Sequence, residues 1–287
     1  SKPAFLARES VRFIREHRDR PFCLFVNFFE PHMPFFGPRD GQYDPAKIPL
    51  PPNFGGEEDK GATLKVRILR EYYRRQGHSG FPLRTPEDWQ AMIARYWGLC
   101  SLVDTHVGTF LDALEAEGLT ERTLVVFTSD HGDMMGSHGL IAKCVPYEEA
   151  VRVPLLLRGP GVPAGGRVRG PVSHVDLVPT LLDLMGLDRP RHLQGVSQRV
   201  ALEQGTAVLE EGGVAVEWNG PNNGIGADDR NRARILEWMK EYGDVEMLRR
   251  AFAAPARTWI SADGWKFTWS GSGEHELYGL NDDPGEQ

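Results

Sequence analysis

The part of the sequence that most constrains the fold is residues 123–154. It opens with the apolar, β-branched run 124–128, LVVFT. Near-continuous hydrophobicity of this kind predicts a strand buried on both faces of a sheet. The run ends at Ser129-Asp130-His131-Gly132, and ligands of open parallel sheets bind just outside the carboxyl ends of the strands. A carboxylate and an imidazole at this point therefore predict a metal or anion site.

The loop after this predicted strand adds more polar chemistry. Asp133, His138 and Lys143 follow within a few residues, and glycines nearby allow a backbone with positive φ. An Asp after a strand is also a common turn former or helix cap, so Asp130 alone would be ambiguous. The density of ionisable and imidazole groups in one short loop favours a site.

Two other apolar runs predict buried strands. Residues 22–29 (FCLFVNFF) lead into Glu30-Pro31-His32-Met33-Pro34, and residues 154–158 (PLLLR) lead into a Gly-Pro-Gly turn. The prolines stiffen the backbone around His32, which reads either as a packed loop residue or as a functional one. We expect all three strands in one mostly parallel sheet, with His32, Asp130, His131 and Lys143 around one pocket.

Helical and short-strand patterns complete an α/β prediction. Helices are predicted over 3–17, 65–75 and 86–118, and another opens at Asp176, whose capping role is favoured over a metal pair with His174. The basic helix 65–75 reads as a solvated face.

Beyond residue 205 the pattern changes to short strands around one helix, 230–252. The strands are predicted at 214–218, 259–261, 265–269 and 277–278. We predict an α/β domain over 1–204 and a small C-terminal α+β subdomain over 205–287.

The bulk composition excludes several classes of protein. Apolar residues make up 40% and charged residues 25%, as in an ordinary globular protein, and the net charge of −7 gives no basic patch for nucleic acid. The longest apolar runs, about eight residues, are too short for a membrane span. Three cysteines show no zinc spacing, and Cys23 and Cys100 are expected to be buried. No signal peptide is visible, which leaves the compartment open between a bacterial cytoplasm and periplasm.

The motifs of this chain resemble those of a known family. The segment FTSDHGDMMGSHGLIAKCVPYEEAVRVPLLLRGPG is similar to the second signature region of the sulfatases, in the alkaline phosphatase superfamily. Family members carry S-D-[HN]-G, G-x-H-G, a Lys and then Y-E-x-x-x-R-V-P-L. The P-H-x-P segment around His32 and the tail HELYGLNDDPGEQ also resemble family segments. The resemblance implies an alkaline-phosphatase-like fold, in which helices sandwich a mostly parallel sheet.

The same resemblance implies roles for five residues. Asp130 and His131 would be metal ligands, and Lys143 would bind sulfate as a point charge. His32 would contact the sulfate or the leaving oxygen as a general-acid candidate, and we assign His138 of G-x-H-G to substrate binding. The family implies Ca²⁺, but His131 stands where other members have Asn, and an imidazole ligand leaves Mn²⁺ or Zn²⁺ open.

Two family elements are absent from this sequence. No early strand ends in a paired Asp-Asp, and no C-x-P-S-R motif supplies the Cys that is oxidised to formylglycine. We therefore expect an N-terminally truncated sulfatase that is inactive alone, binds its metal weakly and acts, when whole, on a sulfated small molecule or glycan. The alternatives are a phosphonate monoester hydrolase or phosphodiesterase of the same superfamily, or a non-catalytic anion-binding module. The alcohol half of the substrate and the oligomeric state stay open.

Overall fold

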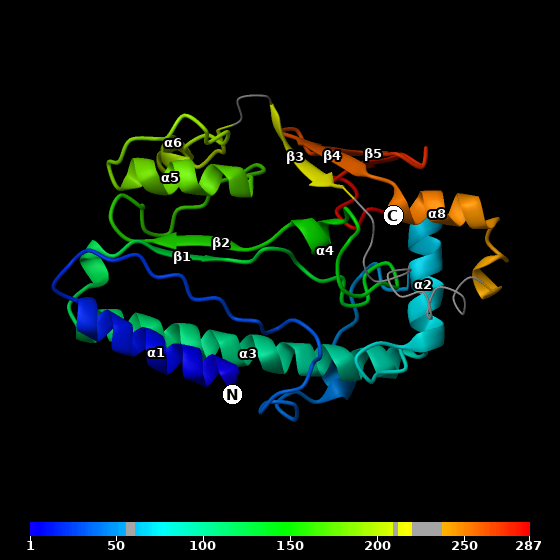
Figure 1. The fold of residues 1–287 in the computed structure, drawn as a ribbon, viewed down its shortest axis with the longest axis horizontal. Helices are drawn as coiled ribbons and strands as arrows, with labels where there is room; N and C mark the ends of the chain where they lie inside the picture. Colours follow the sequence, from blue (N-terminus) through cyan, green and yellow to red (C-terminus); the bar gives the residue numbers. More distant parts are fainter. Residues whose placement is uncertain (56–60, 209–211, 220–236) are drawn as a thin grey trace. The chain divides into compact units, whose positions relative to one another are not determined.

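The computed structural model describes residues 1–55, 61–208, 212–219 and 237–287 (Figure 1). The chain forms two compact units. The first contains residues 1–51 and 72–125, and the second contains residues 52–71 and 126–287. Residues 205–287 thus lie wholly within the second unit, and the predicted domain boundary at 204 stays a prediction.

The first unit is built on two helices that pack along each other (Figure 1), α1 (Lys2–His17) and α3 (Pro86–Ala116). Both confirm the predicted helices. Thr85 starts α3 with a capping box, because its side chain accepts from the Asp88 N–H and the Asp88 carboxylate accepts in return. The short 3₁₀ helices η1 (Pro45–Lys47) and η2 (Thr120–Arg122) belong to the same unit. A buried cluster joins the helices, and its members are Ile14, Ala113, Leu114 and Leu119.

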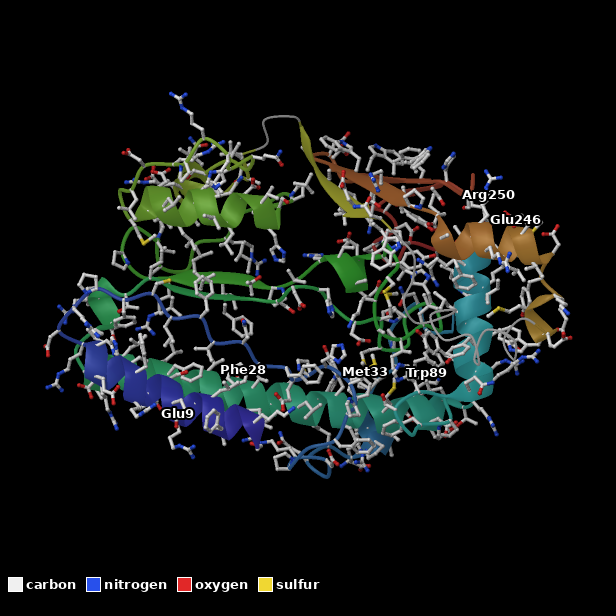
Figure 2. All side chains as sticks on the ribbon, viewed as in Figure 1. Glu9, Phe28, Met33, Trp89, Glu246 and Arg250 are labelled. Atoms are coloured by element: carbon white, nitrogen blue, oxygen red, sulfur yellow. The ribbon has the colours of Figure 1, made fainter. Side chains whose placement is uncertain are left out.

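The predicted strand over residues 22–29 is not observed. The segment is extended, with alternate side chains turned inward, and Phe28 (labelled in Figure 2) stacks on Phe110 of α3 at a centroid distance of 5.9 Å. Phe25, on the other face, is 84% exposed, and Cys23 is exposed rather than buried. The apolar run favours an extended backbone, but a strand also requires a hydrogen-bonded neighbour. Within the described residues this segment has none.

The second unit carries the strand pair that leads into the predicted site. β1 (Val125–Thr128) pairs with β2 (Leu155–Arg158), as predicted from their apolar runs. The expected burial on both faces is wrong, since Leu156 is 62% and Phe127 is 37% exposed. The helices that follow in the chain are α4 (Glu148–Val151), η3 (His174–Asp176), α5 (Leu177–Leu184) and α6 (Arg199–Gln204).

A four-stranded antiparallel sheet confirms the predicted short strands near the C-terminus. Its order is β3 (Gly213–Trp218), β4 (Ala256–Ser261), β5 (Trp265–Ser270) and β6 (Glu276–Gly279). The register places Thr258 of β4 between Val216 and Thr268, and the two threonine hydroxyls lie 2.9 Å apart.

The predicted helix over 230–252 is wrong in its extent. Residues 230–236 lie outside the described residues, residues 237–239 are helical, and residues 240–244 interrupt the helix before α8 (Val245–Ala253). It starts at Asp244, whose carboxylate accepts from the Met247 N–H, just after Gly243 with φ of 158°. The N-cap at Asp244 starts a new helix, so one continuous helix does not form across this point.

The basic helix α2 (Leu64–Gln76) confirms the helix predicted at 65–75, with residues 64–71 in the second unit. Together the helices and sheets confirm the α/β class. None of the helices that the structure describes has both the length and the apolar character needed to cross a membrane.

Candidate active site

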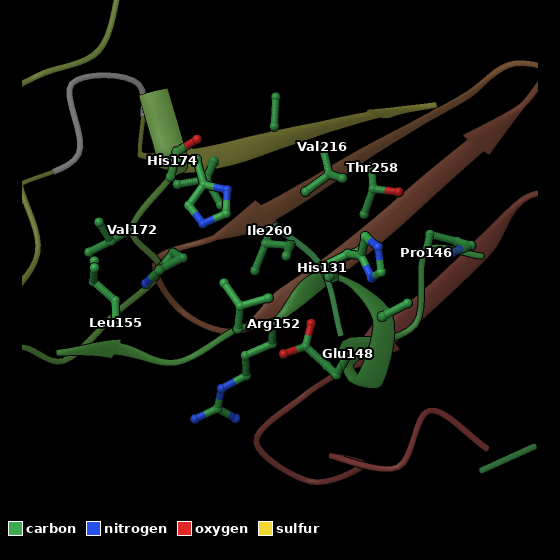
Figure 3. A pocket seen from close by; sticks show the side chains of 18 of the residues that line it. His131, Pro146, Glu148, Arg152, Leu155, Val172, His174, Val216, Thr258 and Ile260 are labelled. Atoms are coloured by element: carbon green, nitrogen blue, oxygen red, sulfur yellow. The ribbon is translucent and has the colours of Figure 1, made fainter. Parts of the chain in front are cut away.

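A cleft of about 1700 Å³ lies within the second unit. The loop that follows β1 contributes Asp130, His131 and Lys143 to its lining, and β2, β3 and β4 contribute apolar side chains such as Leu155, Val216 and Ile260 (Figure 3). Three of the five residues predicted for the site therefore share one cleft.

The ring of His131 is oriented by its own loop. Its Nδ1 lies 2.8 Å from the carbonyl oxygen of Gly132, so Nδ1 carries a proton and donates it to that carbonyl. The other nitrogen, Nε2, lies 3.5 Å from Oδ2 of Asp130. A backbone carbonyl that fixes the non-ligating nitrogen is the usual support of a metal-binding histidine.

The carboxylate of Asp130 is exposed and lies beside Nε2 of His131. Burial would raise the pKa of Asp130, but the charge of His131 and hydrogen bonds from the His131 N–H and Ser129 outweigh it, and the pKa is lowered. Oδ2 of Asp130 and Nε2 of His131 are thus neighbouring groups of the types that ligate metal ions. Among the described residues no group of three or more His, Cys, Asp or Glu side chains is arranged to hold a metal. The assignment of Asp130 and His131 to a metal ion stays a prediction.

Gly132 lets this loop approach α4 closely. Its N–H donates to the carbonyl of Ala150 at 2.9 Å, and a Cβ at this position would lie 2.0 Å from the carbonyl oxygen of Glu149. No side chain fits at that distance, so the backbone of Asp130 and His131 is set by contact with α4.

Gly132→Ala is expected to destabilise the protein by about 1–3 kcal/mol, because the clash is with backbone atoms that can yield only by moving the loop or α4. The free energy of unfolding from urea denaturation measures this loss. The matched control is Gly108→Ala in α3, where an added Cβ meets nothing within 4 Å. That control is expected to be neutral or to gain up to about 1 kcal/mol of helix stability. Equal effects of the two substitutions would contradict the close-approach argument.

Asp133 closes the loop that carries Lys143. Its Oδ1 accepts from the N–H of Ala142 at 2.8 Å and of Met135 at 3.3 Å. Burial raises the pKa of this carboxyl, although the two backbone bonds and the charges of Lys143 and His131 oppose the rise. Lys143 itself stands between two non-glycine residues in the left-handed region, Ala142 at φ 67° and Cys144 at φ 82°.

His138 lies in the same loop but does not line the cleft. Its side chain is fully buried and stacks on Tyr147 with ring centroids 3.9 Å apart and an interplanar angle of 7°. The backbone N–H of His138 donates to the backbone carbonyl of Asn53 at 2.9 Å. These contacts give His138 a packing role under the loop, and its assignment to substrate binding stays a prediction.

His32 belongs to the first unit. Its Nδ1 lies 2.8 Å from the Met33 carbonyl and its ring packs against Phe29 at a centroid distance of 4.7 Å. Cis peptide bonds precede both Pro31 and Pro34. The structure thus gives a defined local conformation, while the expected approach of His32 to Asp130 stays a prediction.

His174 and Asp176 separate into two roles. Asp176 is buried and accepts from the N–H groups of Ser173 at 3.1 Å and Val196 at 2.9 Å, so its side chain completes the capping box of η3. It makes no side-chain hydrogen bond to the start of α5, so the expected capping of that helix is wrong. His174 lines the cleft (Figure 3), with Nε2 3.4 Å from the hydroxyl of Thr128.

Sequence reasoning missed a buried ionic cluster beside the cleft. Lys266 of β5 is 1% exposed, and its Nζ lies 2.9 Å from Oε1 of Glu148 and 2.8 Å from Oε1 of Glu286. Glu286 also accepts from the Glu148 N–H through Oε2 at 2.6 Å. Glu148 lines the cleft at the start of α4. The signal was available, since both glutamates fall in motifs shared with the family, Y-E and D-P-x-E.

Comparison with known proteins identifies the family. The model of the family described as Sulfatase matches residues 3–187. The chain belongs to the sulfatase family. An uncharacterized sulfatase, YidJ, of Escherichia coli K12 is 30% identical over 98% of this chain and 49% of its own length. A choline-sulfatase of Rhizobium meliloti is 33% identical over 64% of this chain and 36% of its own.

Solved structures agree on the fold. A phosphonate monoester hydrolase from Silicibacter pomeroyi superposes with a TM-score of 0.78 at 26% identity, over 98% of this chain and 54% of that one. The alkaline-phosphatase-like α/β fold is thus confirmed. The sulfatase chain described here spans about half the length of these relatives or less.

Proposed function

We propose that this chain is the metal- and sulfate-binding part of a sulfuric ester hydrolase. The observation that carries the proposal is the placement of Asp130, His131 and Lys143 on one cleft within a single unit. Membership in the sulfatase family supports the hydrolase class. The substrate would be a sulfated small molecule or glycan.

The residues of this chain would bind and orient the sulfate group. The Asp130 carboxylate and the Nε2 of His131 would hold a divalent cation, which when bound would withdraw electron density from a sulfate oxygen. Lys143 would attract the anionic group as a point charge from the cleft wall. His32 would hydrogen-bond the sulfate or the leaving oxygen. The nucleophile of the family, formylglycine, has no counterpart in this chain.

The types of donor atom bear on which divalent cation would bind. A carboxylate suits Ca²⁺, the ion that the family implies, whereas an imidazole nitrogen suits Mn²⁺ or Zn²⁺ better. The carboxylate and the family therefore favour Ca²⁺ as the proposal, and the imidazole of His131, which would ligate through Nε2, keeps Mn²⁺ and Zn²⁺ as its competitors.

A second function is favoured by one observation. The phosphonate monoester hydrolase from Silicibacter pomeroyi is similar in fold over nearly the whole of this chain. A tetrahedral phosphonate ester has the same need for a cation and a lysine as a sulfate ester. The alternative proposal is therefore hydrolysis of a phosphonate monoester or phosphodiester at the same cleft.

The test has two parts. The polypeptide encoded by the complete reading frame is assayed with 4-nitrophenyl sulfate and with a 4-nitrophenyl phosphonate monoester, and we expect the larger kcat/KM for the sulfate. A larger value for the phosphonate would select the alternative. In parallel the 287-residue chain is titrated with Ca²⁺ and Mn²⁺ by calorimetry, and we expect weak binding and no turnover, because two ligands leave most coordination positions to water. Micromolar affinity with robust turnover would contradict the proposed division of the site.

A further inference from the structure

The loop that carries Lys143 is held by helix α2, a segment for which the sequence predicted only a solvated face. Two cations of α2 donate to carbonyls of this loop. Nζ of Lys65 lies 2.6 Å from the carbonyl oxygen of Cys144, and Nε of Arg70 lies 2.8 Å from that of His138. The loop is also tight against the helix, because a Cβ on Gly139 would lie 2.9 Å from the Arg70 side chain. All these residues belong to the second unit.

Lys65 acts where the backbone on both sides of Lys143 lies in the left-handed region. The residues on both sides of Lys143, Ala142 and Cys144, have positive φ and are not glycines. Such conformations persist only where surrounding contacts fix them. Asp133 fixes the first by accepting from the Ala142 N–H, and Lys65 fixes the second by donating to the Cys144 carbonyl.

Lys65 is itself confined. Its ammonium lies over the ring of Trp218 of β3, 5.3 Å from the centroid, and the residue lines the same cleft as Lys143. Within the described residues no carboxylate lies at ion-pair distance from Lys65. Burial lowers the pKa of Lys65, with the Cys144 thiol and Glu276 acting in the opposite direction. The hydrogen bond to the Cys144 carbonyl therefore holds the Lys65 ammonium against the loop.

We propose that Lys65 is a positioning residue for Lys143, holding the peptide after it so that Lys143 faces the cleft. The proposal rests on the proposed function only for the role of Lys143 as the anion-binding charge. It gives helix α2 a role at the candidate site. It also predicts that the effects of substituting Lys65 and Lys143 are coupled.

The first measurement is the position of the loop, by amide hydrogen exchange in the 287-residue chain. Lys65→Met keeps the length and apolar stem of the side chain but removes the donor. We expect the amides of Met134 and Ala142, which are bonded within the loop, to exchange about tenfold faster or more. Lys65→Arg, which keeps a donor, is expected to retain most of the protection. Arg67→Met is the matched control, because this exposed cation on the same helix does not bond the loop.

The second measurement is a double-mutant cycle on the affinity for inorganic sulfate, measured by calorimetry. Lys65→Met is expected to weaken sulfate binding about tenfold in the wild-type chain and less than twofold in the Lys143→Ala background. A merely structural lysine would not produce that coupling.

The outcomes separate the two proposals. Unchanged exchange in the loop of Lys65→Met, or equal losses of sulfate affinity with and without Lys143, would overturn the positioning role. Absence of sulfate binding in the wild-type chain, combined with faster loop exchange in Lys65→Met, would leave the positioning of Lys143 supported and would count against the proposed function.

Discussion

Lys143→Ala is expected to lower kcat/KM for 4-nitrophenyl sulfate by about 10²–10³-fold in the polypeptide encoded by the complete reading frame. The physical reason is the loss of a charge held in place before the reaction, which is comparable with removing one preorganised donor from an oxyanion hole. The loop fixes the backbone on both sides of Lys143, because Asp133 accepts from the Ala142 N–H and both Ala142 and Cys144 have positive φ.

The control for Lys143→Ala is Lys47→Ala in η1, whose side chain is 83% exposed. It removes the same charge from the protein but not from the cleft, and we expect no measurable change in kcat/KM. Initial rates over a range of substrate concentrations separate the effect on kcat from that on KM. Activity of Lys143→Ala within a factor of three of wild type would assign this lysine to a solvated surface instead.

Lys266→Met is expected to reduce the free energy of unfolding by about 3–5 kcal/mol at pH 8. The substitution removes the cation from a buried cluster and leaves Glu148 and Glu286 facing each other without it. Breaking a buried ion pair from one side costs this much because an uncompensated charge stays inside. Urea denaturation of the 287-residue chain measures the change.

The pH dependence of this loss has a definite sign. Burial raises the pKa of the Glu286 carboxyl, although Lys266 and the Glu148 N–H oppose the rise, and removing Lys266 raises it further. A folded state with a raised carboxyl pKa binds protons more tightly than the unfolded state, so its stability falls as pH rises between the two pKa values. The deficit of Lys266→Met is therefore largest above the raised pKa and shrinks as the pH is lowered through it.

The control for Lys266→Met is Lys240→Met, since Lys240 forms an exposed pair with Glu237 at 2.7 Å. Exposed pairs of this kind contribute about 0–1 kcal/mol. A loss below about 1 kcal/mol for Lys266→Met, or a deficit that grows as the pH falls, would show that the charge of Lys266 does not stabilise the cluster.

Local sequence signals predicted the elements that depend on local physics. The helices α1 and α3 follow from long 3.6-residue patterns, and the loop from Asp130 to Lys143 was recognised because polar residues interrupt a β-branched run. The errors arise where structure depends on neighbours distant in the sequence. Residues 22–29 have the composition of a strand but no hydrogen-bonded neighbour among the described residues.

The two lysines that were missed, Lys65 and Lys266, were missed for different reasons. Lys65 looked like one of several cations on a solvated helix, yet it lies four residues before the buried Leu69 and so shares a helix face with it. That spacing was a usable signal. The pairing of Lys266 with Glu148 and Glu286 joins residues more than a hundred positions apart in one case, and no periodicity within a segment reveals such a contact.

The order of the strands has a consequence for the kinetics of folding. β4, β5 and β6 are joined by the short connections 262–264 and 271–275, so their antiparallel pairing involves only local contacts and is expected to form fast. β1 and β2 are separated by residues 129–154, the segment that contains Asp130, His131 and Lys143. Closing that longer loop costs chain entropy before the strand pair returns any stability. The loop over residues 129–154 is therefore expected to be among the last parts of the second unit to become ordered during folding. Substitutions within it should accelerate unfolding far more than they slow folding.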